Sequence, residues 1–135
     1  LYNWYAATAG TGVYGTSAGV NATASICPKG WKLPTGGSGG NFANLDIAYG
    51  GSGSNRTGDT SQVTKFLASP LNFNYTGDRY GGSVRWPSGY ATYWSSTANS
   101  EVYAYYLDFN SDGYFSPQDL SGKYRGFAIR CLAAS

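Results

Sequence analysis

The sequence predicts an α+β domain with many short strands, a few short helices and long loops. Two segments in the first half carry apolar residues at helical spacing, whereas β-branched and aromatic residues interrupted by Gly, Asp and Pro fill the second half. The 135 residues suffice for one core but are few for two, so we expect a single domain over residues 1–135.

The composition is compatible with an extracellular surface. Charged residues make up 12% of the chain, while 20 of the 135 residues are Gly and 13 are Tyr. Tyr, Ser, Asn, Thr and Gly can hydrogen-bond and stack without ion pairs, as they do in antibody paratopes. A Gly-rich β domain with long loops explains the same composition equally well.

The charges and the ends of the chain restrict the partners we expect. Nine basic and seven acidic residues give a net charge of +2 with no run of Lys or Arg, so nucleic acid is not an expected partner. No stretch approaches the about 18 apolar residues of a membrane helix, so we expect no direct membrane insertion. Since the sequence starts at Leu1 without Met, we expect a domain excised from a larger secreted or cell-surface protein.

Cys27 and Cys131 are the two cysteines, and we predict a disulfide between them. Neither belongs to a CxxC pair, and the chain has no His to complete a zinc site. Closing a loop of about 100 residues stabilises a fold by roughly 4–5 kcal/mol in the chain-entropy model, and it implies an oxidising compartment. Two buried free thiols in a cytosolic protein are the alternative.

The first half of the chain is expected to contain an opening strand, a loop and two helices. Residues 1–26 are interpreted as the strand and loop, and the two prolines and one glycine of residues 27–35 fix a bent course around Trp31, which we expect in the core. A flexible stretch over 36–40 precedes a short helix that starts near Asn41.

The second helix has clear signals at both ends. Asp59 or Thr60 can cap its start, apolar residues recur through Leu67, and Pro70 ends it. From Leu71 onward short strands are predicted. They cover residues 71–75, 83–86, 91–96, 102–109 and 127–132. In the fourth of these, Tyr103, Tyr105, Leu107 and Phe109 alternate with Ala104, Tyr106 and Asp108.

Four fragments resemble one known family in the same order along the chain. They are YNWYAA at 2–7, CPxGWxLPT at 27–35, YWSST at 93–97 and GFAIRC at 126–131. The family is the Fibrobacter succinogenes major paralogous domain, which looks like a bacterial branch of the C-type lectin-like fold. The resemblance implies two helices flanking a mixed, mostly antiparallel sheet, with the first and last strands brought together. It departs before Leu45, where a Gly-Ser stretch replaces the acidic-Trp pair of the family.

The chain offers few groups for catalysis, so we expect no enzyme and assign no catalytic residue. There is no His, and the seven carboxylates show no paired spacing outside one segment. Relatives that modify sulfatases use thiols, whereas both cysteines here stand in the structural motifs.

Residues 108–119 match a calcium loop of the EF-hand kind. Asp108, Asn110, Asp112 and Asp119 would be ligands, with Gly113 at the sharp turn. The alternative is a β-hairpin, because Asp-Gly is a strong turn signal and the preceding residues favour a strand rather than a helix. We favour the hairpin and therefore assign no metal and no other cofactor.

The function that we expect is a binding or adhesion module that recognises a glycan or a protein surface on a cell. Relatives of this fold contact ligands through the C-terminal region, and the exposed contacts expected here are Asn110, Asp112, Tyr114 and Ser116. The alternative is a self-associating subunit of a bacterial surface layer or appendage. Asn-x-Thr sequons occur at Asn21, Asn55 and Asn74, the first two in loops that we expect to be exposed.

Overall fold

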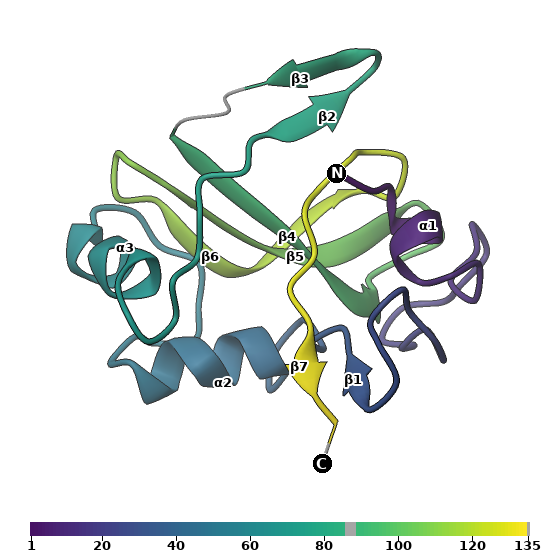
Figure 1. Cartoon of the computed structure of the whole chain (residues 1–135), viewed down its shortest axis with the longest axis horizontal. Helices are drawn as coiled ribbons and strands as arrows, with labels where there is room; N and C mark the ends of the chain where they lie inside the picture. Colours follow the sequence, from purple (N-terminus) through teal and green to yellow (C-terminus); the bar gives the residue numbers. More distant parts are fainter. Residues whose placement is uncertain (86–88, 135) are drawn as a thin grey trace.

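A three-stranded antiparallel sheet lies at the centre of the molecule (Figure 1). The computed structural model describes residues 1–85 and 89–134. Its helices there are α1 (Trp4–Ala7), α2 (Asn41–Ala48) and α3 (Thr60–Leu67). Its strands are β1 (Trp31–Lys32), β2 (Asp78–Tyr80), β3 (Ser83–Arg85), β4 (Tyr90–Ala98), β5 (Tyr103–Asn110), β6 (Phe115–Gly122) and β7 (Leu132–Ala133). The architecture is thus α+β, with mostly antiparallel sheets and few short helices.

The central sheet has the order β4–β5–β6, so neighbours in sequence are neighbours in space. Tyr93 pairs with Leu107 and Phe109 pairs with Phe115. The strands predicted at 91–96 and 102–109 are confirmed, and so is the hairpin after residue 109. The small β2–β3 hairpin stands above the sheet in Figure 1, and the predicted strand 83–86 is confirmed as far as Arg85, whereas Trp86 lies outside the described residues.

Both predicted helices are confirmed, because their start signals are local. Asn41 begins α2, where its backbone N–H donates to Thr35 Oγ1 (2.9 Å) while the Thr35 N–H donates to Asn41 Oδ1 (2.9 Å). Asp59 caps α3 and accepts a bond from the Gln62 N–H (3.2 Å). Reciprocal or capping bonds of this kind satisfy the free N–H groups of a first helical turn.

Apolar side chains form one core on each face of the sheet. Alternation along β5 divides them, since Leu107 and Phe109 point to one face and Ala104 and Tyr106 to the other. The first core lies against α2 and α3 and includes Phe42, Val63, Phe66, Phe73, Leu107, Phe109 and Phe115. The second lies against α1 and includes Trp4, Leu33, Trp94, Tyr106 and Phe127.

The two ends of the chain are tied together. Cys27 and Cys131 form the predicted disulfide, with their Cα atoms 5.8 Å apart. Next to it β1 pairs antiparallel with β7, and Tyr2 forms a bridge with Phe127. The segment 127–132 was predicted as one strand, but only its last residue belongs to β7, because Phe127 bonds to Tyr2 instead of to a continuous neighbour.

Two other expectations for the first half were wrong. A helix, α1, stands where a strand was expected, because Asn3 accepts a bond from the Ala6 N–H (2.8 Å) and so caps a helical turn. Trp31 is 51% exposed instead of packing in the core. It follows a turn in which its N–H donates to Pro28 O (2.9 Å), and Leu33 supplies the core contact of this segment.

The strand predicted at 71–75 is also wrong. Asn72 has φ +52°, outside the extended region, and the N–H groups of the segment bond to a helix and a side chain rather than to a neighbouring strand. The Phe73 N–H donates to Phe66 O (2.8 Å), and the Asn74 N–H donates to the Tyr93 hydroxyl (3.0 Å). Phe73 is buried, and Leu71 and Tyr75 pack half-buried against the same core, so the aromatic residues that predicted a strand contribute to packing instead.

A buried lysine holds the N-terminal loop. Lys123 Nζ donates to four backbone carbonyls, those of Val13 (3.2 Å), Tyr14 (3.3 Å), Thr16 (3.4 Å) and Glu101 (2.8 Å). It also lies 4.7 Å from the centre of the Trp4 ring, a cation–π distance. These four carbonyls and the Trp4 ring take the place of the water molecules that normally hydrate a lysine ammonium group.

Candidate functional site

The β5–β6 hairpin ends in a tight turn at residues 110–114. The Asn110 N–H donates to Tyr114 O (3.0 Å), and Gly113 has φ +93°, the left-handed conformation that such hairpin loops require. Asn110 Oδ1 accepts bonds from the N–H groups of Asp112 (2.9 Å) and Tyr114 (3.3 Å). The Asn110 side chain is therefore used in holding the turn.

The four expected contact residues have different surroundings. Asp112 is exposed, whereas Tyr114 is half-buried and its hydroxyl donates to Asp119 Oδ2 (3.1 Å). The expected exposure of Ser116 is wrong: it is fully buried and donates to Asn55 Oδ1. The loop before α3 covers it, since Arg56 forms a backbone bridge with Phe115. Ligand contact by the four residues stays a prediction.

Asp108 and Asp119 form a carboxyl pair on the same face of β5 and β6. Burial raises the pKa of Asp108 well above its usual range, and the charge of Asp119 adds to the effect. The Tyr106 hydroxyl donates to Asp108 Oδ2 (3.3 Å), and Asp108 Oδ1 is buried without a hydrogen-bond partner among the described residues. This environment favours the neutral carboxyl.

The strand and turn geometry of residues 108–119 differs from that of the calcium loop that the sequence resembles. Residues 108–119 form two strands and a turn rather than the helix-flanked loop of an EF-hand. The side-chain oxygen of Asn110, which would be a calcium ligand, already accepts two hydrogen bonds from backbone N–H groups of the turn. Over residues 1–85 and 89–134, no three acidic, Cys or His side chains gather as a metal site.

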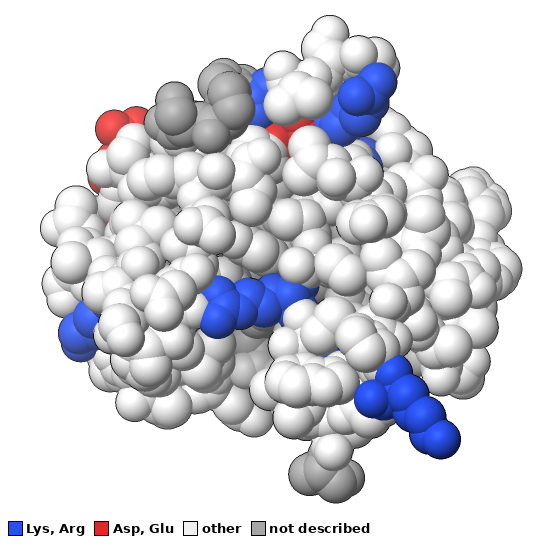
Figure 2. Space-filling view, viewed as in Figure 1, with Lys and Arg blue, Asp and Glu red and all other residues white. Residues whose placement is uncertain are grey.

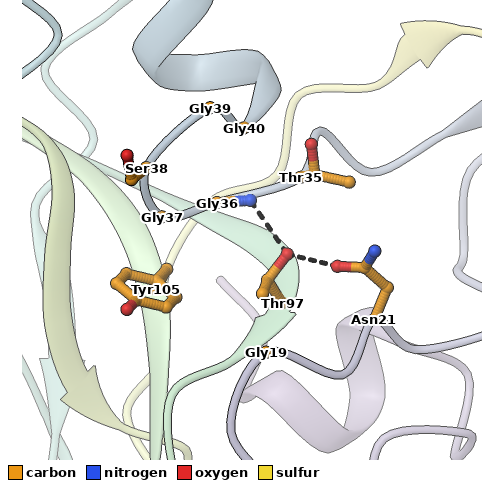
Figure 3. Close-up of a pocket in the computed structure, with 10 residues that line it drawn as sticks. All are labelled: Gly19, Asn21, Thr35, Gly36, Gly37, Ser38, Gly39, Gly40, Thr97 and Tyr105. Atoms are coloured by element: carbon orange, nitrogen blue, oxygen red, sulfur yellow. Dashed lines mark hydrogen bonds between the residues drawn. The ribbon is translucent and has the colours of Figure 1, made fainter.

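A polar cavity of about 320 Å³ lies at the opposite end of the sheet, near the β4–β5 connection (Figure 3). We call it the Asn21 cavity. The glycine-rich loop 36–40 covers it, Thr97 of β4 and Tyr105 of β5 form its sheet side, and Asn21 comes from the N-terminal loop. Its lining contains amide, hydroxyl and backbone groups and one aromatic ring, but no charged side chain.

Thr97 connects the two loops of the Asn21 cavity. Its Oγ1 accepts a bond from the Gly36 N–H (2.9 Å) and donates to Asn21 Oδ1 (Figure 3). Because Oδ1 is used in this way, the Asn21 amide keeps its Nδ2 donor, which meets no partner in the described part of the chain. The cavity thus presents an oriented hydrogen-bond donor.

The glycines of the loop permit a close approach to the sheet. A Cβ atom on Gly36 would lie 2.4 Å from Ser95 Oγ and 2.5 Å from Tyr105 Cβ. At Gly37, φ is +80° and a Cβ would lie 3.2 Å from the Tyr105 ring. The sequence indicated a flexible stretch here, but these glycines allow close packing. Asn99 Nδ2 donates to the Tyr105 hydroxyl (3.0 Å) and fixes the ring from the other side.

Comparison with known proteins adds no relative: no family model, curated protein or solved structure matches the chain. The fold and the site therefore define a disulfide-closed α+β domain with a neutral polar cavity. Across residues 1–85 and 89–134 there is no candidate for a membrane-spanning helix.

Sequence reasoning missed the Asn21 cavity. The sequence signals at these positions point elsewhere: Asn21 belongs to a sequon, Thr97 to the YWSST fragment and Tyr105 to a predicted strand. The run of glycines directly before a helix was the available signal, because glycine allows the backbone to approach a partner closely. The exposure expected for Asn21 and Asn55 is confirmed.

Proposed function

We propose that this chain is a non-catalytic binding domain of an extracellular or cell-surface protein, and that it takes a neutral glycan in the Asn21 cavity. The observation that carries the proposal is a polar lining without any charged side chain. Sugars bring hydroxyls that need amide and hydroxyl partners and an apolar ring face that suits an aromatic side chain. Asn21, Thr97 and Tyr105 supply these groups.

Three further features support this proposal. The volume of about 320 Å³ lies at the lower end of the range for small-molecule sites, which suits a small saccharide. The Cys27–Cys131 disulfide agrees with an oxidising compartment. The resemblance to a C-type lectin-like family, inferred from the sequence, suggests carbohydrate or protein recognition. No carboxylate, amine or imidazole lines the cavity, which supports a binding role over catalysis.

A glycan array followed by calorimetry tests the site. Asn21→Ala removes the oriented amide and should weaken binding of the selected glycan at least about tenfold, the effect of 1.4 kcal/mol. Thr97→Val, which also removes the bond to Asn21, should do the same. Asp112→Ala, at the far hairpin turn, is the control and should bind like wild type. Loss of binding in Asp112→Ala alone would place the ligand at the β5–β6 turn instead.

A second candidate function is self-association, and an exposed aromatic cluster favours it. Tyr80 on β2 is 44% exposed, Tyr124 is 58% exposed, and their ring centres lie 5.9 Å apart. The Arg85 and Arg125 guanidinium groups lie 4.9 and 4.7 Å from the centre of the Tyr80 ring. Tyr and Arg are enriched at the centres of protein interfaces.

Light scattering at rising concentration tests self-association. If the cluster joins copies of the chain, the mean mass should rise with concentration, and Tyr80→Ser with Tyr124→Ser should keep the protein monomeric. Tyr14→Ser, which removes a tyrosine that is 60% exposed elsewhere, is the matched control. A constant monomer mass for wild type would remove this candidate.

A further inference from the structure

An apolar groove lies between α2 and the C-terminal segment, separate from the Asn21 cavity. Its volume is about 420 Å³, within the usual range for small-molecule sites. Leu45 of α2, Leu71, Phe73 and Leu132 supply apolar walls, and Arg130 is the charged residue that lines it.

Arg130 has an unusual environment for a cation. It is half-buried, and its guanidinium carbon lies 4.2 Å from the centre of the Phe73 ring. It makes no ion pair and no side-chain hydrogen bond with the residues that the structure describes, where the ion pairs belong to Arg56, Arg85 and Arg125. The neighbouring Cys131 forms the disulfide with Cys27, which fixes this part of the backbone to the segment before β1.

The wider surface supplies no counter-charge there. On the face that carries α2 and β7, Lys and Arg gather only at the upper edge and stand apart from one another below it, and Asp and Glu are visible only near that edge (Figure 2). A partly desolvated cation without an anionic partner costs free energy that a bound anion can recover.

We propose that this groove binds a small amphipathic carboxylate. The apolar or aromatic part of the ligand lies along Leu45, Leu71 and Leu132, and the carboxylate pairs with the Arg130 guanidinium, whose planar donors suit a bidentate bond. A single cation in apolar walls balances the charge of a monoanion such as a carboxylate, whereas a doubly charged phosphate would keep one charge unpaired. This ligand class differs from the neutral glycan of the Asn21 cavity, so the inference goes beyond the proposed function.

Titration with 4-phenylbutyrate and with its neutral analogue 4-phenylbutan-1-ol, followed by ¹H–¹⁵N NMR, tests this inference. The acid should shift the backbone amides of Leu45, Leu71 and Cys131 and should bind at least about tenfold more tightly than the alcohol. Equal affinities for acid and alcohol, or no shifts in the groove at millimolar acid, would overturn the proposal.

Two variants distinguish a specific ion pair between the ligand and Arg130 from a general effect of the positive charge of the protein. Arg130→Gln should reduce the affinity for the acid to that for the alcohol, while the affinity for the alcohol stays unchanged. Lys32→Gln on the neighbouring β1 removes the same charge and should leave both affinities as in wild type; an equal loss in this variant would contradict a specific pair.

A second variant tests the groove if Arg130→Gln fails to fold. Asn44 is exposed and lines the groove from α2, so Asn44→Trp should fill the space without disturbing the core and should abolish binding of both probes. Unchanged binding in Asn44→Trp would place the probes elsewhere and refute the site. These outcomes do not involve Asn21, Thr97 or Tyr105, so they leave the glycan proposal to its own test.

Discussion

Single residues in this protein take their chemistry from the strand position they occupy. Asp108 follows Leu107 in β5, and the alternation of the strand directs its carboxyl toward Tyr106 and Asp119 rather than toward the α2–α3 core. Burial there raises the pKa of Asp108, and burial also raises that of the Tyr106 hydroxyl, which the nearby carboxylates increase further. The ionisation of this pair should therefore make the free energy of unfolding depend on pH.

We expect the stability of the protein to fall as pH rises above about 4, the ordinary pKa of Asp. A carboxyl with a higher pKa in the folded chain binds protons on folding, so stability is complete at low pH and is lost as Asp108 ionises. Urea unfolding should give a free energy lower by about 1–3 kcal/mol at pH 8 than at pH 5. Asp108→Asn should flatten this dependence; the same slope in both proteins would contradict it.

At the scale of elements, a buried ionic network joins α2 to α3. Asp46 of α2 is fully buried and accepts bonds from Arg56 Nη1 (2.7 Å) and Nη2 (2.7 Å), Gln62 Nε2 (2.8 Å) and the Gly53 N–H (2.9 Å). Arg56 also binds Asp59 (2.6 Å), and chiefly this hydrogen bond lowers the pKa of that carboxyl. One guanidinium thus ties the end of one helix to the cap of the next.

Asp46→Ala should destabilise the protein by about 3–5 kcal/mol, since it removes the buried carboxylate that pairs with Arg56 and accepts bonds from Gln62 and Gly53. The free energy of unfolding in urea measures the effect. Asp112→Ala removes an exposed carboxylate and should change that free energy by no more than about 0.5 kcal/mol. A loss below about 1 kcal/mol for Asp46→Ala would show that water replaces the network.

The elements also show which features the sequence could predict. The helices at 41–48 and 60–67 depend on caps within a few residues, and the β5–β6 turn depends on Gly113, so local patterns sufficed. Trp31 and Phe73 differ from the expectation because distant segments build their surroundings, Ala133 of β7 in one case and Phe66 with Tyr93 in the other. The Asn21 cavity joins residues from four separate segments, and no local sequence pattern indicates that such distant segments come together.

In the whole molecule, two aromatic cores lie on opposite faces of one sheet, and the disulfide closes the chain around both. Cys27 leads into β1 and Cys131 into β7, so the covalent bond and the β1–β7 pairing act on the same two segments. The Tyr2–Phe127 bridge adds a second link between the ends. The bond therefore restricts the unfolded chain, and Cys27 also packs against the core on the α1 face of the sheet.

Replacing both cysteines by alanine should lower the free energy of unfolding by roughly 4–5 kcal/mol, the chain-entropy cost of opening a loop of about 100 residues. Urea unfolding of the double variant measures it, and wild type unfolded under reducing conditions is the control. Near-ultraviolet circular dichroism should stay that of wild type, because both cores remain. A loss below about 1 kcal/mol would show that the denatured chain is already constrained elsewhere.

The carbonyl contacts of Lys123 have a consequence for chemical reactivity. Lys29, Lys32 and Lys65 are exposed, so an acylating reagent should modify them and leave Lys123 intact while the protein is folded. Coupling the domain to an amine-reactive glycan or sensor surface would then preserve the N-terminal loop and with it the position of Asn21. The rate at which Lys123 becomes acylated would then measure how often that loop opens.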